Sequence, residues 1–277
     1  MTADTADGDR VVLLCTVRGC GLPLRRLERG LVCARSHSFD TARSGYVNLL
    51  QPQDRRSRHP GDSKEAVLAR RRFLDGGYAE PLVSRLAGLA AEAPAGPILD
   101  AGCGEGHHLD AFRRRRGGEA HGADISTPAI DLASRTFRAC SFVVANADRF
   151  LPYADGSFAL ITSITARMNA AEFRRLLRSD GMLLIAVAGP DDLIELREAI
   201  LGEGTRVDRT GPAIRALEGE FTLLRQERIR AVAPLDRQAI ADVMTSSYRA
   251  MRARERERLA ALPPMDVTLS RDVQIWA

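Results

Sequence analysis

The sequence predicts an α/β protein: a largely parallel sheet covered by helices on both faces, preceded by a small metal-binding module. From Pro97 onward, short apolar segments alternate with helix-like segments, which is typical of repeated β–α units. Before that point, Cys15, Cys20, Cys33 and His37 lie within 23 residues, although the chain has only five cysteines and five histidines. A chain of 277 residues is long enough for one large domain and a smaller companion.

The composition predicts a folded protein without membrane segments. Hydrophobic residues make up 45% of the chain and charged residues 27%, which excludes a largely disordered chain. No apolar run reaches the roughly 18 residues of a membrane helix. The first ten residues are polar and acidic, unlike a signal peptide. We therefore expect a cytoplasmic protein that does not bind membranes.

The domain boundaries follow from the distribution of apolar residues and turn signals. Residues 10–46 contain short β-like pieces, at 11–14 and 30–32, and too few apolar residues to form a core unaided. The residues that follow are rich in proline and arginine. We expect four parts: a disordered tail (1–9), a zinc-binding module (10–46), a linker with a connecting helix (47–80) and the main domain (81–277).

The connecting helix has clear start and stop signals. Its sequence, KEAVLARRRFLD, follows Asp62 and Ser63, which suit N-cap positions, and it stops at Gly76-Gly77. A second helix is expected at 81–92.

The main domain is predicted to form β–α units followed by an antiparallel hairpin. Strands are expected at 98–101, 120–123, 141–145, 159–164 and 182–188. Helices are expected between and after them, at 107–115, 128–137, 170–178 and 193–201. The end of the chain differs, because two strands (221–232 and 266–276) flank a helix (237–262) without a full crossover. We therefore predict a mixed seven-stranded sheet with the hairpin at its edge.

Positive charge is concentrated near the N-terminus. The net charge is only +4, and 39 of the 40 basic residues are arginine, a bias that a GC-rich genome would explain. The position of the charge needs another reason. Arg10 to Arg72 contains 14 basic and five acidic residues, whereas the rest of the chain is net negative. This distribution predicts a polyanionic partner.

The cysteine spacing predicts a zinc site. Cys15 and Cys20 form one pair, and Cys33 and His37 form a second pair after a β-like excursion. Three thiolates and one imidazole suit tetrahedral zinc, and two such pairs are typical of a zinc ribbon. Bound zinc would stabilise a segment too small for a core. The alternative is a set of unrelated buried thiols, and the wide spacing makes Cys15 the weakest ligand candidate.

A glycine-rich loop follows the first strand of the main domain. It reads Asp100-Ala101-Gly102-Cys103-Gly104-Glu105-Gly106 and opens a helix, and Asp124 ends the second strand about 20 residues later. An acid at that distance suits the hydroxyls of a ribose. The DxGxGxG form resembles motif I of the Rossmann-like methyltransferases, which bind S-adenosylmethionine. Asn146-Ala147-Asp148 lies where that class contacts adenine. A dinucleotide-binding site or a plain tight turn are the alternatives.

The segments around the zinc site resemble one methyltransferase family. SFDTARSGYVNLL (38–50), RSRHPGDS (56–63), ARR (69–71) and FLD (73–75) are similar to the RlmA family, as are Gly189-Pro190 and residues 193–196. The resemblance runs from about Cys15 to the C-terminus, over nine-tenths of the chain. It implies an N-terminal zinc ribbon on a Rossmann-like methyltransferase domain, a homodimer, and methyl transfer from S-adenosylmethionine to N1 of a guanine in a hairpin of 23S rRNA. One branch of the family confers resistance to macrolides such as tylosin.

The resemblance also implies roles for single residues. Cys15, Cys20, Cys33 and His37 match the zinc ligands, and Gly104 and Glu105 match the cofactor loop. The full set of predicted cofactor contacts is Tyr78, Asp100, Gly102, Gly104, Glu105, Gly106, Asp124, Asn146, Ala147, Asp148 and Asp192.

Three positions depart from the family pattern around the predicted methyl-transfer pocket. Tyr78-Ala79 stands where the family has His-Tyr, Asp192 stands where the family has a cofactor-contacting histidine, and Ala166-Arg167 replaces the frequent Ala-Pro. These departures leave the geometry of the cofactor site and the choice of target open.

No residue marks itself as catalytic. N1 of guanine carries a proton that a base or solvent must remove. The nearest candidates are Asp191 and Asp192, for which capping of the following helix is the alternative role. The target base must also leave its stack. RNA contacts are predicted for Arg55, Arg56, Arg58, Arg70, Arg71 and Arg72, since guanidinium groups suit phosphates and guanine edges.

Two other functions fit parts of this pattern. A small-molecule methyltransferase would use the same cofactor, but it would not need a basic zinc module. A non-catalytic RNA-binding protein could have kept the fold and lost turnover through the altered pocket positions.

Overall fold

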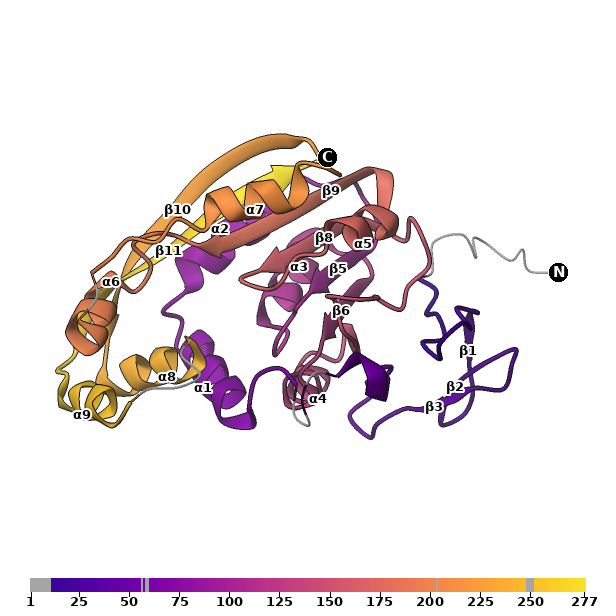
Figure 1. The fold of residues 1–277 in the computed structure, drawn as a ribbon, viewed down its shortest axis with the longest axis horizontal. Coiled ribbons are helices and arrows are strands. Elements are labelled where there is room, and N and C mark those ends of the chain that lie inside the picture. The colour runs from indigo at the N-terminus through magenta and orange to yellow at the C-terminus, as the bar shows by residue number, and fades with distance from the viewer. Residues whose placement is uncertain (1–10, 56, 58–59, 203, 248–251) are drawn as a thin grey trace.

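The computed structural model describes residues 11–55, 57, 60–202, 204–247 and 252–277 (Figure 1). Most of these residues belong to one large α/β body. Its sheet has the strand order β10-β11-β9-β8-β5-β6-β7-β4. The strands are β4 (Val47–Asn48), β5 (Ile98–Ala101), β6 (Ala120–Asp124), β7 (Ser141–Val144), β8 (Phe158–Ile164), β9 (Leu177–Ala188), β10 (Leu223–Leu235) and β11 (Met265–Trp276).

The central strands of the sheet are parallel, and the order in which the chain adds strands reverses at β5. From β5 the chain passes to β6 and β7 on one side, then returns to β8 and β9 on the other. Ile98 of β5 lies opposite Ala120 of β6 and Leu160 of β8. Ligands of such sheets bind beyond the carboxyl ends of the strands at this switch point. The fold therefore places a crevice after β5 and β8.

The two faces of the sheet carry separate apolar cores because side chains alternate along each strand. Ile98 and Leu160 point to the face covered by α2, α3 and α4, whereas Leu99 and Ile161 point to the face covered by α5 and α7. The helices are α1 (Lys64–Asp75), α2 (Glu80–Ala90), α3 (His107–Arg116), α4 (Thr127–Thr136), α5 (Ala170–Leu176), α6 (Ile194–Leu196), α7 (Thr210–Leu217), α8 (Arg237–Ser247) and α9 (Ala253–Ala261).

The predicted antiparallel hairpin is confirmed, but the predicted strand number is wrong. β10 and β11 pair along their whole length, and β11 also pairs with β9. Among the described residues, the large sheet has eight strands rather than seven, because Val47 and Asn48 pair with Val143 and Val144 of β7. These two residues belong to the segment interpreted as linker, and a two-residue strand has too short a pattern to be detected.

Two helices differ from the predictions for identifiable reasons. The helix expected over 237–262 is interrupted, because Arg252, immediately before α9, has an extended backbone with a φ of −69° and a ψ of 161°. α7 was not predicted, since Gly211-Pro212 is typical of a loop. Proline is nevertheless tolerated in the first helical turn.

The segment after β9 is also less regular than expected. It contains one turn of α-helix (α6) and then a π-helical turn, Arg197–Leu201. Leu193 precedes α6 with a φ of 56°, so neither Asp191 nor Asp192 caps the helix. The suggested capping role of these acids is therefore wrong, and their side chains bind elsewhere.

The N-terminal module is a three-stranded antiparallel sheet. Its strands are β1 (Leu24–Arg26), β2 (Gly30–Cys33) and β3 (Ser38–Asp40). The β-like piece at 11–14 forms single bridges, from Leu13 to Tyr153 and from Leu14 to Pro23, instead of a strand. Leu31 and Phe39 join the core on the α5–α7 face of the large sheet. The module thus lies against the main body (Figure 1).

The linker ends at α1 as the sequence predicts. The Ser63 hydroxyl accepts a hydrogen bond from the backbone N–H of Ala66 (3.2 Å), which caps α1. α1 packs mainly against α8 and also contacts α4. The tail predicted at 1–9 lies outside the described residues. No helix in the described part of the chain combines the length and apolar character that a membrane crossing needs.

Candidate active site and zinc centre

A cavity of about 780 Å³ opens at the carboxyl ends of the central strands. The turns after β5, β6, β7, β8 and β9 all contribute to its wall, as do α1, α2 and α8. This is the switch point that the strand order defines. The predicted cofactor residues that line it are Asp100, Gly102, Gly104, Glu105, Asp124, Asn146, Ala147, Asp148 and Asp192.

The glycine loop needs glycine at Gly102 for two reasons. Its φ is +85°, which L side chains rarely adopt, and a Cβ there would lie 2.4 Å from the Cβ of Ala166. Its backbone N–H donates to the carbonyl of Ala123 (2.8 Å), which ties the loop to β6. The loop can therefore pass close to the turn after β8 and leave backbone exposed to a ligand.

Asp124 holds the loop from the neighbouring strand. One carboxylate oxygen accepts the N–H of Gly104 (3.0 Å), and the other accepts the N–H of Ser126 (2.7 Å). The Ser126 hydroxyl in turn donates to the carbonyl of Asp62 (2.8 Å) in the linker. The acid predicted to contact the ribose thus also organises the loop.

The linker forms one wall of the cavity, which sequence reasoning missed. Pro60, Gly61 and Asp62 line it. The side-chain amide of Asn146 donates to the carbonyl of Asp54 (2.9 Å), so the turn after β7 is bonded to the linker. The sequence signal was the PGDS segment, which the family resemblance contained but to which no role was assigned.

Arg70 was predicted to contact RNA but lines this cavity. Its guanidinium pairs with Asp62 (2.8 Å) and donates to the carbonyl of Ser246 in α8 (3.1 Å). One of its nitrogens lies 3.5 Å from the position that a Cβ on Gly104 would take. Arg70 therefore joins the linker, the loop and α8 around the site.

Three carboxyl groups surround the loop. Burial raises the pKa of Asp100 to about 7, although the Thr162 hydroxyl, which donates to it at 2.7 Å, opposes the shift. Burial also raises the pKa of Glu105, against the attraction of Arg70, and that of Asp124, against two backbone N–H donors. A cationic ligand bound beside these groups would favour their charged forms. The site is therefore suited to a positively charged cofactor such as S-adenosylmethionine.

A pH dependence follows from Asp100. A bound sulfonium favours the carboxylate, so the affinity for S-adenosylmethionine should rise several-fold between pH 6 and pH 8, as Asp100 loses its proton near pH 7. S-adenosylhomocysteine, which lacks the sulfonium charge, serves as the control ligand, and its affinity should change less. Titration calorimetry of both ligands on the wild type and on Asp100→Asn tests this. Equal pH dependence in all four cases would contradict it.

Ionisation of Asp100 should have the opposite effect on folding stability: cofactor affinity rises with pH, whereas the free energy of unfolding falls. The unfolded chain has an Asp100 pKa near the ordinary 3.8, so the native state binds more protons between that pH and about 7. This group therefore lowers the free energy of unfolding as pH rises across that range.

Two predicted cofactor residues do not line the cavity. Gly106 is the N-cap of α3 with a φ of 83°, and a Cβ there would lie 2.9 Å from the ring of Phe142, so packing and backbone conformation both require glycine at this position. The Tyr78 ring stacks on Phe73 (5.5 Å between centroids), and Phe73 itself lines the cavity. Tyr78 thus lies behind the residues that line the cavity, and the adjacent Ala79 lines it instead.

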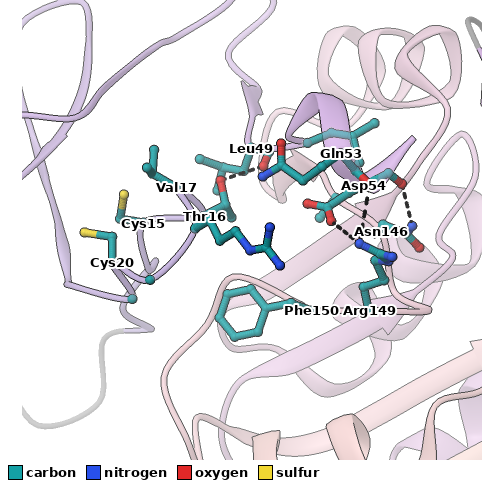
Figure 2. A pocket seen from close by; sticks show the side chains of 15 residues that line it. Cys15, Thr16, Val17, Cys20, Leu49, Gln53, Asp54, Asn146, Arg149 and Phe150 are labelled. Carbon is teal, nitrogen blue, oxygen red and sulfur yellow. Dashed lines mark hydrogen bonds and ion pairs between the residues drawn. The ribbon is translucent and has the colours of Figure 1, made fainter. Parts of the chain in front are cut away.

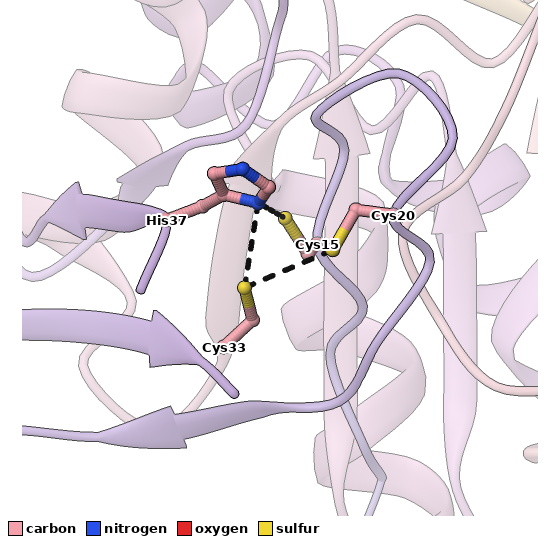
Figure 3. Close-up of side chains that lie close together, drawn as sticks. All are labelled: Cys15, Cys20, Cys33 and His37. Carbon is pink, nitrogen blue, oxygen red and sulfur yellow. Dashed lines mark hydrogen bonds between the residues drawn. The ribbon is translucent and has the colours of Figure 1, made fainter. Parts of the chain in front are cut away.

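The four zinc-ligand candidates come together as predicted (Figure 3). Their ligand atoms all lie within 4.8 Å of one another. Cys20 Sγ and Cys33 Sγ are 3.8 Å apart, and His37 Nδ1 is 3.4 Å from Cys15 Sγ and 3.5 Å from Cys33 Sγ. Zn–S bonds of about 2.3 Å and Zn–N bonds of about 2.0 Å at tetrahedral angles give separations of this size. The donor set therefore fits zinc, with Cys15 included.

The turn that carries Cys15 and Cys20 borders a second cleft, of about 670 Å³, beside the sheet (Figure 2). The Thr16 hydroxyl donates to the carbonyl of Leu49 (2.7 Å), and Gln51 donates to that hydroxyl (3.0 Å). On the opposite wall, Arg149 pairs with Asp54 (3.0 Å). The zinc centre is thus fixed to the start of the linker, and through it to the cofactor cavity.

The other predicted RNA contacts have mixed positions. Arg55 is exposed, whereas Arg56 and Arg58 lie outside the described residues. Arg71 pairs with Asp75 (2.6 Å), and its guanidinium lies over the Phe137 ring (4.9 Å). Arg72 makes a bidentate pair with Asp242 of α8. Arg71 and Arg72 thus each have a protein partner, because α1 packs between α4 and α8, and their contact with RNA stays a prediction.

Known proteins match both halves of this architecture. Residues 15–58 match the family described as RlmA, N-terminal (a zinc ribbon), and residues 98–181 match a methyltransferase domain. The chain is 36% identical over 260 residues to the 23S rRNA (guanine(748)-N(1))-methyltransferase of Streptomyces fradiae. The alignment covers 91% of this chain and 92% of the relative. The chain belongs to the RlmA family of methyltransferases.

Further relatives agree with this RlmA assignment. The chain is 35% identical over 264 residues to the putative 23S rRNA (guanine-N(1)-)-methyltransferase YxjB of Bacillus subtilis, covering 89% of this chain and 90% of that protein. It is 37% identical over 208 residues to a putative enzyme of the same name from Micromonospora griseorubida, covering 66% and 68%. The resemblance drawn from the sequence motifs is therefore confirmed, and the site described above is that of an S-adenosylmethionine-dependent methyltransferase with a zinc ribbon.

Proposed function

We propose that this RlmA-family protein transfers the methyl group of S-adenosylmethionine to N1 of a guanine in a hairpin of 23S rRNA. The observation that carries the proposal is one chain in which a zinc ribbon is bonded, through the linker, to a methyltransferase cavity. The linker contributes Pro60, Gly61 and Asp62 to that cavity and receives the bond from Asn146. The relative from Streptomyces fradiae is named for guanine 748 of 23S rRNA, which makes the same guanine the first candidate target.

The distribution of charge supports an RNA substrate. The segment from Arg10 to Arg72 carries 14 basic and five acidic residues and includes the zinc module and the linker. Exposed guanidinium groups there suit phosphate contacts. A small-molecule methyltransferase has no use for this module. We further propose that the protein acts in the cytoplasm as a homodimer and, as in one branch of the family, confers macrolide resistance.

Transfer of label tests the proposal. The protein is incubated with methyl-labelled S-adenosylmethionine and, in parallel, with unmodified 23S rRNA or a pool of small metabolites. We expect label in 23S rRNA, close to one methyl per molecule, and none in the metabolites. Label confined to the metabolites would favour a small-molecule enzyme. Cofactor binding without transfer to either would indicate a protein that kept the fold and lost turnover.

A further inference from the structure

Asp192 and Arg271 form an ion pair on the wall of the cofactor cavity. Asp192 lies in the turn after β9, Arg271 lies in β11, and their side chains meet at 2.7 Å. The side chains are 11% and 24% exposed. A carboxylate and a guanidinium thus stand side by side at the end of a strand two places from the glycine loop.

The backbone fixes this pair in position. The second carboxylate oxygen of Asp192 accepts the N–H of Ser270 (2.8 Å), and Arg271 lies opposite Ala188 in the antiparallel register. The turn itself is tight, since a Cβ on Gly189 would lie 2.1 Å from the Ser270 hydroxyl. Asp192 is therefore held on β11 before any substrate binds, as a group that acts in a transition state should be.

The pair matches the Watson–Crick edge of guanine. That edge presents O6 as an acceptor and N1–H and the N2 amino group as donors, so a carboxylate and a guanidinium side by side can bind all three. Leu82 and Leu86 of α2 and Leu193 add an apolar wall nearby in the same cavity, which suits the face of a base. The acids of the cofactor half, Asp100, Glu105 and Asp124, are buried around the glycine loop.

We propose that Asp192, instead of making the cofactor contact that the family resemblance implies, binds the target guanine and accepts its N1 proton, with Arg271 donating to O6. This inference rests on the proposed function. The N1 proton moves to the Asp192 carboxylate, and the N1 electron pair forms the bond to the methyl carbon. The carbon–sulfur bond breaks with its electron pair going to sulfur, which leaves a neutral thioether, and Asp192 releases its proton to water. Arg271 stabilises the negative charge that develops on O6 as N1 loses its proton.

Other groups near the pair differ from Asp192. Asp191 pairs with Arg230 of β10 (3.0 Å) and does not line the cavity. His108 of α3 lines it, but burial lowers the pKa of His108 to about 3, with smaller effects from His107 and Arg271. His108 therefore does not contribute to a rate change between pH 6 and pH 9. Apart from the carboxyl groups around the glycine loop, the other charged residues that line the cavity are Asp54, Asp62, Arg70, Asp148, Arg167, Arg197 and Arg209. Burial raises the pKa of Asp100 to about 7, so the rates are compared at saturating S-adenosylmethionine, where its effect on cofactor affinity does not enter.

The first test replaces Asp192 by asparagine, which keeps the shape and an acceptor for the Ser270 N–H. Single-turnover methylation of the rRNA hairpin at pH 7 should slow by about 10²–10⁴-fold, while the affinity for S-adenosylmethionine stays within about twofold of the wild type. The rate of the variant should rise about tenfold per pH unit toward alkaline pH, because solvent must now remove the proton, whereas the wild-type rate should be nearly flat. Asp191→Asn is the matched control and should keep the wild-type rate and profile.

The second test replaces the target guanine by inosine, which lacks the N2 amino group. The wild type should prefer guanine by about tenfold or more, since a site that binds an amino group rejects the analogue without it. Asp192→Ala should lose this preference. A wild-type rate and pH profile in Asp192→Asn, or unchanged discrimination in Asp192→Ala, would overturn the inference. Failure of the wild type to methylate the RNA would instead overturn the proposed function.

Discussion

Gly102→Ala is expected to weaken binding of S-adenosylmethionine by about a hundredfold, or ~2.7 kcal/mol. The new Cβ would lie 2.4 Å from the Cβ of Ala166, and the residue would have to keep a φ of +85°. The loop must then move away from the turn after β8, which displaces the backbone that faces the cofactor. Calorimetry or equilibrium dialysis with the purified variant measures the affinity.

Two further variants separate the contact from the backbone conformation. Gly117 also has a positive φ (+74°, with a ψ of −173°), but a Cβ there meets nothing within 4 Å, so Gly117→Ala should cost about 1–3 kcal/mol of stability and leave cofactor affinity intact. Adding Ala166→Gly to Gly102→Ala removes the clashing Cβ and should restore part of the affinity. Wild-type affinity in Gly102→Ala, or no recovery in the double variant, would show that this contact does not shape the loop.

Cys33→Ser is expected to abolish zinc binding and RNA binding together. Cys33 is buried and lies within 3.8 Å of Cys20 Sγ and 3.5 Å of His37 Nδ1, so its loss opens the centre. Binding of zinc contributes on the order of 10–16 kcal/mol in small zinc modules, which is more than the apolar contacts of a three-stranded sheet can replace. Metal analysis should fall from about one zinc per chain to near none, and the affinity for the rRNA hairpin should drop at least tenfold.

The matched control for the zinc centre is Cys140→Ser. Cys140 is half-buried and lies outside the centre, so this variant should keep both zinc and RNA affinity. Cofactor affinity, measured on Cys33→Ser itself, shows whether the main domain remains folded. Unchanged RNA binding after complete loss of zinc would exclude the module from RNA recognition.

The sequence predicted the elements whose patterns are local. The expected strands such as Ile98–Ala101, the hairpin of β10 and β11, the capped start of α1 and the clustering of the four zinc-ligand candidates are confirmed. Each was predicted from periodicity, capping residues or ligand spacing. The loop, Asp124 and the Asn146–Asp148 turn also meet in one cavity, because the ends of neighbouring parallel strands lie at one edge of the sheet.

The features that sequence reasoning missed depend on contacts between distant segments. Val47 becomes a strand only because Val143 offers a free edge, and Arg70 faces the cavity only because Asp62 and α8 hold it there. Arginine is a residue type that suits RNA contacts, but the protein partner of Arg72, Asp242, is 170 residues away in the sequence and could not be foreseen. Likewise, the pairing of Asp192 with Arg271 follows from the antiparallel register of β9 and β11, which no local pattern encodes.

Mapping the methylated nucleotide tests the central claim most directly. After reaction with S-adenosylmethionine, 23S rRNA is read by primer extension, which stops at a base methylated on its Watson–Crick edge, and the nucleosides are separated by mass spectrometry. The account predicts one new stop, at a guanine in a hairpin, and 1-methylguanosine as the only new nucleoside. A methyl group on another atom, on another base or on no RNA at all would contradict it.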